Sequence, residues 1–328
     1  MQTGSQLKEI RVTNNGNPQY SSDSVSLRGL VTVPLQLYPG KNLLRVVCTS
    51  LDGIESYDTL SVFSTFQPQI KPNLYVLAVG VSRYKNSLYN LKYAQNDAES
   101  LSATLRDNFS KSEYATITVK QLVNENATVS NILAGFDEIS RLIQPNDRFI
   151  FYFAGHGTLS TSVLEQEFYL ITHEIESLSD ERTLRNTGLS VHLLQSKFLA
   201  LKCEKKALVL DACHAGAVTA SFMEEQSGTT KILRQLPRTS GVYLMSAALG
   251  SQLARESDNL QHGIFTTALL EGLNGKAASM EDRQISLSTL QDYIQKRIKK
   301  LKTELQFNQT PIFRSDDTDG FVVTQLQH

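Results

Sequence analysis

The chain has little cysteine, almost no net charge and no long apolar segment. Three of its 328 residues are cysteines, Cys48, Cys203 and Cys213, and none lies in a CxxC pair or at the spacing of a zinc site. Such a small and odd number of cysteines argues against both a disulfide scaffold and a zinc site. The formal net charge is −1, and the densest basic cluster, KRIKKLK at 296–302, has the pattern of a solvated helix face. The composition therefore does not indicate a nucleic-acid-binding protein.

The apolar runs are short. None approaches the roughly 18 residues that a membrane-spanning helix needs, and the first ten residues, MQTGSQLKEI, lack the apolar core of a signal peptide. We therefore expect a cytoplasmic protein with no membrane partner. With 328 residues, 41% of them hydrophobic, the chain is long enough for about two globular domains.

The pattern of the sequence changes near residue 72. Before it, short alternating runs are separated by the turn pairs Pro39-Gly40 and Asp52-Gly53, which is typical of antiparallel strands. Residues 1–72 are therefore predicted to form a small all-β segment, an immunoglobulin-like sandwich that is incomplete at this length, followed by a linker. Such a segment could connect the rest of the chain to an upstream sensor or scaffold.

Residues 73–328 alternate apolar strands with amphipathic helices. The runs NLYVLAVGV, DRFIFYFAG and KKALVLDAC are continuous enough to be buried strands, and helical patterns such as AQNDAESLSATLRDNF lie between such strands. This order predicts an α/β fold whose mostly parallel sheet is covered by helices on both faces. In such sheets, active sites gather outside the carboxyl ends of the strands.

Two of these strands end in residues with catalytic chemistry. FIFYFAGHG carries His156 at its end, and KALVLDACHAG carries Cys213. If the strands are neighbours, His156 can take the proton of the Cys213 thiol, whose thiolate then attacks a carbonyl. The backbone N–H of Gly157, expected in a turn, could stabilise the oxyanion. The adjacent His214 is a weaker candidate base, because successive side chains on a strand point to opposite faces.

The motifs FAGHG and DACHAG, in which Cys213 follows 57 residues after His156, resemble those of caspase-fold cysteine peptidases, and most of all the metacaspases and their bacterial relatives, the orthocaspases. The resemblance extends in element order from about residue 74 to 321. It implies a caspase-like fold, a His156–Cys213 dyad, and an oxyanion hole formed by the backbone N–H groups of Gly157 and Cys213. It also makes a role in bacterial cell death or antiviral defence an expectation.

Asp211 stands two residues before the cysteine. A carboxylate near a nucleophilic thiol disfavours the thiolate, so Asp211 is expected to serve something other than activation. A buried anion needs a cation, which an arginine or lysine side chain of a protein substrate would supply. The resemblance likewise places Asp211 and a second acid, Asp97, in the pocket for the residue before the scissile bond, P1. The third pocket residue, from SAALGSQ, is Gln252 and not an acid, which weakens the charge argument a little. Leu91 stands where aspartate-specific caspases carry arginine, so cleavage after basic residues is favoured.

The segment 218–239 has little periodicity and is predicted to be a long loop. It contains three candidate sites of self-cleavage, and an uncut active-site loop is the alternative. Some metacaspases need calcium, but the acids of THEIESLSDER lack the spacing of a calcium loop, and SDDTDG near the C-terminus is more typical of a solvated turn. We therefore expect no metal or other cofactor, with calcium as the alternative. The candidate cleavage sites are Lys231, Arg234 and Arg238.

The sequence leaves several function classes open. A cysteine endopeptidase specific for Arg or Lys is preferred. The same fold could have another P1 specificity, acidic or other, or could be a catalytically silent binding module. The intact set of His156, Gly157 and Cys213 argues against the silent module. An acyltransferase would keep the dyad but has no evident use for paired acids in its pocket.

Overall fold

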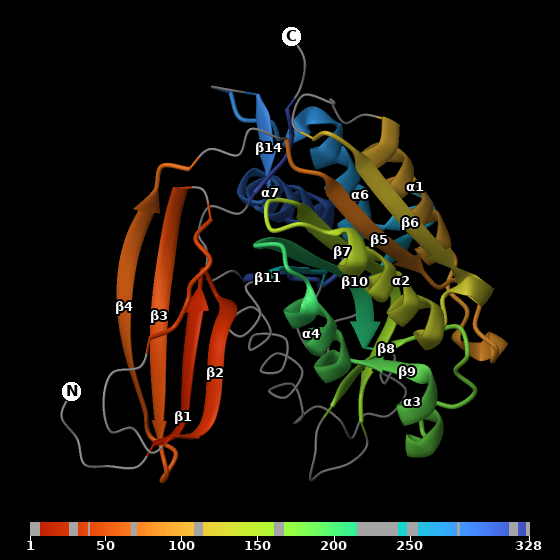
Figure 1. Ribbon diagram of the computed structural model, residues 1–328. Helices are drawn as coiled ribbons and strands as arrows, with labels where there is room; N and C mark the ends of the chain where they lie inside the picture. Colours follow the sequence, from red (N-terminus) through yellow and green to blue (C-terminus); the bar gives the residue numbers. More distant parts are fainter. Residues whose placement is uncertain are drawn as a thin grey trace.

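The protein consists of a four-stranded sheet and a larger body in which helices pack on both sides of a second sheet (Figure 1). The first sheet ends at residue 64 and the second begins at residue 74, on either side of the predicted change near residue 72. The computed structural model describes residues 7–25, 32–38, 40–66, 71–107, 114–160, 167–214, 242–247, 255–280, 283–314 and 321–325.

The N-terminal sheet is antiparallel throughout, with the strand order β2-β1-β3-β4. Its first hairpin turns at Asn15-Gly16 and its last at Asp52-Gly53, where positive φ angles at Asn15, Gly16 and Gly53 make the turns tight. The antiparallel β organisation expected for this segment is confirmed. Within the described parts of 7–66 the four strands form one sheet, and a second sheet that would complete a sandwich is not found there. The strands are β1 (Leu7–Asn14), β2 (Asn17–Val25), β3 (Gly40–Ser50) and β4 (Glu55–Ser64).

This sheet contacts the larger body through the turn between β1 and β2. The side-chain amide of Asn15 donates to Glu204 Oε1 at 2.5 Å, and that of Asn17 to the Glu204 carbonyl at 3.3 Å. Glu204 directly precedes strand β10 (Lys205–His214). A strand of that length spans about 30 Å, so the contact lies at the opposite end of β10 from Cys213.

Among the described residues, eight strands form the sheet of the larger body. Its main path is β15-β11-β10-β7-β5-β6, and β8 and β9 extend it from the side of β7. The pairs along β11-β10-β7-β5-β6 are all parallel, whereas β15 and β8 join antiparallel. The mostly parallel sheet predicted from the sequence is confirmed. The other strands are β5 (Leu74–Gly80), β6 (Ile117–Val123), β7 (Arg148–Leu159), β8 (Phe168–Ile171), β9 (Gly188–Ser190), β11 (Val242–Ser246) and β15 (Ile312–Arg314).

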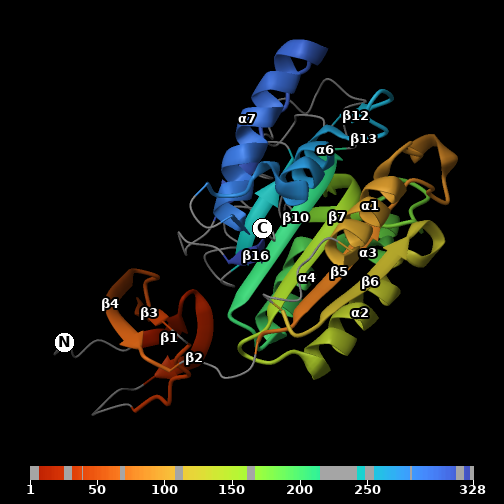
Figure 2. The ribbon, with the colours of Figure 1, turned by 90° about the horizontal axis from the view of Figure 1, so that it is seen from above.

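Helices cover both faces of this sheet (Figure 2), and an apolar core lies between the sheet and each helical layer. Along β5, Val76 and Ala78 belong to one core and Leu77 and Val79 to the other, because successive side chains of a strand alternate between faces. Helices α1, α6 and α7 cover the first face, and α2, α3 and α4 cover the second. The helices are α1 (Ala94–Asp107), α2 (Val129–Leu142), α3 (Glu181–Thr187), α4 (Val191–Ala200), α6 (Ile264–Glu271) and α7 (Leu287–Leu305).

The helices form where the apolar residues recur at helical spacing. In α1, Ala94, Ala98, Leu101 and Leu105 are all buried in the first core. Helix α7 begins at a capping box, in which Ser286 and Thr289 satisfy each other's backbone N–H groups. None of the described helices combines the length and the apolar character needed to cross a membrane.

Short elements complete the larger body. Helix α6 continues into a π turn, Gly272–Lys276, and two antiparallel strand pairs lie outside the main sheet. Of these, β12 with β13 leads directly into α6 and so matters for the site. The strands of the two pairs are β12 (Glu256–Ser257) with β13 (His262–Gly263), and β14 (Gln284–Ser286) with β16 (Val322–Gln325).

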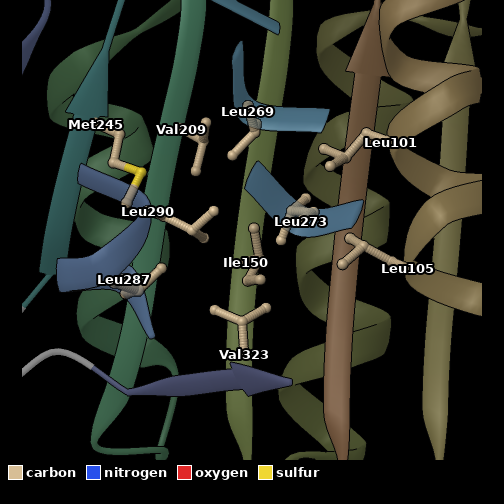
Figure 3. Close-up of a pocket in the computed structure, with 10 residues that line it drawn as sticks. All are labelled: Leu101, Leu105, Ile150, Val209, Met245, Leu269, Leu273, Leu287, Leu290 and Val323. Carbon is tan, nitrogen blue, oxygen red and sulfur yellow. The ribbon is translucent and has the colours of Figure 1, made fainter. Parts of the chain in front are cut away.

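A cavity lies inside the first core, between the sheet and helices α1, α6 and α7 (Figure 3). All ten residues that line it are apolar, so it offers a ligand no polar group. Since catalysis requires polar groups, this cavity does not have the character of a catalytic site. The lining residues are Leu101, Leu105, Ile150, Val209, Met245, Leu269, Leu273, Leu287, Leu290 and Val323.

Candidate active site

His156 and Cys213 lie side by side on neighbouring strands. Strand β7 pairs in parallel with β10, and the register of this pair sets His156 opposite Cys213 and Gly157 opposite His214. Paired strands are about 4.8 Å apart. The structure thus brings the backbones of the two predicted catalytic residues together at the carboxyl ends of their strands.

The imidazole of His156 has one defined tautomer. Its Nε2 lies 2.8 Å from the carbonyl oxygen of Tyr89. A carbonyl can only accept, so Nε2 carries the proton and donates, and Nδ1 keeps a free lone pair. This Nδ1 is buried and has no hydrogen-bond partner among the described residues. It is the atom that can accept a proton from the cysteine.

The surroundings also keep His156 neutral. Burial disfavours the charged imidazolium and lowers the pKa of His156, although the hydrogen bond to the Tyr89 carbonyl and the charge of Glu256 act in the opposite direction. A general base must be unprotonated before it acts. The environment of His156 therefore suits the role of proton acceptor at neutral pH.

Tyr84 holds His156 from another direction. The backbone N–H of His156 donates to the Tyr84 hydroxyl at 2.9 Å, and the two rings lie 5.3 Å apart between centroids. Gly155, with φ of +158°, lets the backbone approach this hydroxyl, because a Cβ there would lie 3.0 Å from Tyr84 Oη and from the Phe153 ring. The segment of Tyr84 and Tyr89 therefore positions both the backbone and the ring of His156.

Gly157 lies in a strand and not in a turn, so that expectation was wrong. Strand β7 continues past His156 to Leu159, because Gly157 pairs with Leu170 of the antiparallel strand β8 as well as with β10. A side chain at this position would overlap the ring of Phe168, which explains the glycine. Its assignment to the oxyanion hole stays a proposal.

The two predicted pocket acids meet at the N-terminus of α6. Asp97, in the first turn of α1, accepts the Gly263 N–H at 3.2 Å on Oδ1 and 3.1 Å on Oδ2. Asp211 Oδ2 accepts from Thr266 N at 3.1 Å and from Thr266 Oγ1 at 2.6 Å. A Cβ on Gly263 would overlap Asp211 Oδ2 and lie 3.0 Å from Asp97 Oδ2. Only a glycine fits between the two carboxylates.

Both acids are buried, Asp97 at 2% and Asp211 at 7% exposure. Burial raises the pKa of Asp211 to about 7, and the charge of Asp97 acts in the same direction. Burial also raises the pKa of Asp97, while hydrogen bonds from His262 and Gly263 limit the rise. Within the described part of the chain, neither acid has an arginine or lysine as an ion-pair partner. The site thus holds buried negative charge without a strong cation.

Three residues near the acids were not predicted from the sequence to belong to the site. His262 Nδ1 lies 2.7 Å from Asp97 Oδ1. Glu256 accepts the backbone N–H groups of Lys92 and Tyr93, just before α1, and its charge acts on Asp97, Asp211 and His156. Thr266 lies in the first turn of α6 and His262 lies just before this helix, and no sequence motif marks either residue.

Other predicted residues do not join this site. Leu91 packs against both apolar cores. The acids of segment 172–182 are engaged elsewhere: Asp180 caps α3, and Glu176 pairs with Lys85. In the described ranges, no three side chains of the metal-binding types cluster as a metal site would require. Gln252, Lys231, Arg234, Arg238 and the segment SDDTDG lie outside the described residues, as does the side chain of Cys213.

A parallel sheet with a histidine and a cysteine in register at its carboxyl edge is the arrangement expected of an α/β cysteine peptidase. The chain belongs to the caspase domain family, Peptidase C14, whose pattern it matches over residues 74–322. It therefore carries a cysteine peptidase domain of caspase type, with an N-terminal antiparallel sheet before it.

Individual relatives agree with this assignment. Metacaspase-1 of Debaryomyces hansenii is 24% identical over 216 residues, 64% of this chain and 48% of that protein. Metacaspase-1 of Schizosaccharomyces pombe is 27% identical over 233 residues, 69% and 52% of the two chains. The chain thus spans about half the length of these relatives. The crystal structure of protein GSU0716 from Geobacter sulfurreducens has the same fold, with a TM-score of 0.54 at 15% identity over 76% of this chain and 95% of that one.

Proposed function

We propose that this protein is a cysteine endopeptidase that cleaves proteins after arginine or lysine with a His156–Cys213 dyad. The observation that carries the proposal is the register of His156 opposite Cys213, together with an imidazole whose Nδ1 is free to accept a proton. The buried pair of Asp97 and Asp211 supports the basic specificity, since a substrate cation would neutralise charge that no described lysine or arginine pairs with.

The reaction follows from these positions. His156 Nδ1 takes the proton of the Cys213 thiol, and the sulfur forms a bond to the carbonyl carbon of the scissile peptide. The tetrahedral oxyanion is stabilised by the backbone N–H groups of Gly157 and Cys213. When the C–N bond breaks, the proton on Nδ1 passes to the leaving amine. Water, deprotonated by the same nitrogen, then hydrolyses the thioester and frees Cys213.

One observation favours a different P1 specificity for the same enzyme. Asp97 and Asp211 already accept backbone N–H groups at the start of α6, and carboxylates stabilise helix N-termini without any substrate. The acids would then hold α6 in place, and specificity would come from other residues. A cleavage profile on a peptide library, run with and without calcium, separates the two possibilities and tests the cofactor expectation.

The peptidase activity is tested by two substitutions. Cys213→Ala and His156→Ala should each abolish hydrolysis of an Arg-containing peptide while leaving the melting temperature within a few degrees. The losses should not add in the double variant, because the two residues act as a unit. Full turnover by either single variant would refute the dyad.

The biological role is proposed on the resemblance alone. A place in bacterial cell death or antiviral defence, and an upstream sensor or scaffold bound through the N-terminal sheet, are parts of the same proposal. Self-cleavage after Lys231, Arg234 or Arg238 would leave fragments in purified protein that the Cys213→Ala variant lacks. Fully active protein that stays whole would show that processing is not needed.

A further inference from the structure

His262 covers one oxygen of the deeper pocket acid. Its Nδ1 lies 2.7 Å from Asp97 Oδ1, and its side chain is 19% exposed where that of Asp97 is 3% exposed. The surrounding backbone fixes this contact, because Gly263 N donates to both oxygens of Asp97 and Asn96 Nδ2 donates to the Gln261 carbonyl at 2.8 Å. Residues 261–263 are therefore attached to the start of α1.

The charges around His262 are mostly negative. Asp97 faces it from α1, while Asp211 from β10 and Glu256 from β12 lie close to Asp97 and interact with its charge. At the rim, the ammonium of Lys92 is held by Asp258 at 2.9 Å, in the turn between β12 and β13. Arg255 is exposed, and it contacts this region through its backbone carbonyl, which accepts a hydrogen bond from Ile264 N. Among the described residues, the His262 imidazole is therefore the group that can place a positive charge next to Asp97.

An imidazole and a basic substrate side chain compete for the same acid. Both donate N–H groups to a carboxylate, and the pair is strongest when the imidazole is charged. Histidine is the side chain whose charge changes close to neutral pH, whereas arginine and lysine stay charged there. The charge of the internal competitor therefore depends on pH, whereas the charge of the substrate side chain does not.

We propose that His262 is the internal counter-ion of the empty P1 pocket and that the basic side chain of the substrate displaces it from Asp97. The inference rests on the proposed basic specificity. His262 then determines how strongly the enzyme prefers basic over neutral P1 residues at each pH. A charged imidazole holds Asp97 and weakens the preference, whereas a neutral imidazole yields to the substrate.

The test compares matched peptides with arginine or its neutral isostere citrulline at P1. The ratio of their kcat/KM values is measured from acid to alkaline pH for wild type and His262→Asn, which keeps an N–H donor near the Nδ1 position but cannot be charged. We expect the variant to exceed the wild-type ratio by about tenfold near pH 5.5 and by less than about twofold near pH 8.5. His192→Gln is the control, since His192 also pairs with a carboxylate, Glu167, but is 68% exposed.

The outcomes separate this inference from the proposed function. A wild type with no preference for arginine at any pH would refute the basic specificity itself. A clear wild-type preference whose pH dependence is unchanged in His262→Asn would overturn only the role of His262. A preference lost at every pH in the variant would also overturn it, because His262 would then support the pocket. If His262→Asn does not fold, as judged by thermal melting, His262→Ala takes its place with the same expected ratios.

Discussion

Replacing Asp211 by asparagine isolates the charge of the proposed pocket. The carboxylate accepts from Thr266 N and Thr266 Oγ1 through one oxygen, Oδ2. An asparagine amide oxygen in the same place can accept both bonds, so the start of α6 is preserved. Removing one member of a desolvated charge pair costs roughly 2–5 kcal/mol, which is about 30-fold to several-thousand-fold in kcat/KM. The loss should fall on peptides with Arg or Lys at P1 and spare neutral ones.

The pH dependence follows from the raised pKa of Asp211. The cation requires the ionised carboxylate, which is populated above about pH 7, so the catalytic advantage of wild type over Asp211→Asn grows as pH rises through that value. The effect on folding has the opposite sign. An acid whose pKa rises from 3.8 to about 7 on folding stabilises the protein at low pH, and this contribution, about 4 kcal/mol at most, is lost as pH rises through 7. The melting temperature of Asp211→Asn relative to wild type should therefore increase between pH 5 and pH 8.

The assay needs a readout of the nucleophile that does not involve the pocket. Alkylation by iodoacetamide, followed at Cys213 by mass spectrometry, should be at least as fast in Asp211→Asn, because removing a nearby anion favours the thiolate. Asp97→Asn should give the same pattern of selective loss. A variant that loses alkylation together with hydrolysis would mean that Asp211 supports the strand end or the dyad, and the specificity argument would be refuted.

Three further predictions concern His156 and its neighbours. Gly157→Ala should destabilise the protein by about 1–3 kcal/mol in urea unfolding, since its Cβ overlaps the Phe168 ring; Phe168→Leu in the same chain should recover part of the loss, and no recovery would point to another cause. Tyr84→Phe keeps the ring beside His156 but leaves the buried His156 N–H without its acceptor, so kcat should fall about tenfold or more at unchanged KM; a change in KM alone would rule out a role in positioning His156. For a neutral substrate, the acid limb of kcat/KM should lie below pH 6.5, because burial lowers the pKa of His156 from that value; a limb above it would mean that another group titrates.

The position of His156 and Cys213 at the ends of neighbouring strands could largely be predicted from local sequence patterns. Continuous apolar runs identified β7 and β10 as buried parallel strands, and a parallel sheet brings the ends of neighbouring strands together, so His156 and Cys213 could be paired from their motifs. The meeting of Asp97 with Asp211 required the resemblance to a family as well. An acid in the first turn of a helix has an adequate explanation in the helix dipole, so nothing local marks Asp97 as part of a pocket.

The partners of these residues could not be predicted for a physical reason. His156 is oriented by the carbonyl of Tyr89, a backbone group that every residue possesses. The contact of His262 with Asp97 joins residues 165 positions apart, through a two-residue strand too short to leave a periodic pattern. The continuation of β7 beyond His156 depends on pairing with β8, which only the tertiary structure reveals.

In the proposed mechanism, His156 activates Cys213 beside a pocket for basic side chains. The most direct test of this mechanism is the rate at which two peptidyl chloromethyl ketones label Cys213. The two reagents differ only in having arginine or aspartate at P1, and labelling is measured by mass spectrometry of the intact protein and of its peptides. We expect a single adduct on Cys213 in wild type, formed much faster with the arginine reagent, and almost none in His156→Ala. Faster labelling by the aspartate reagent, equal labelling of the His156 variant, or an adduct on Cys48 or Cys203 in place of Cys213 would contradict it.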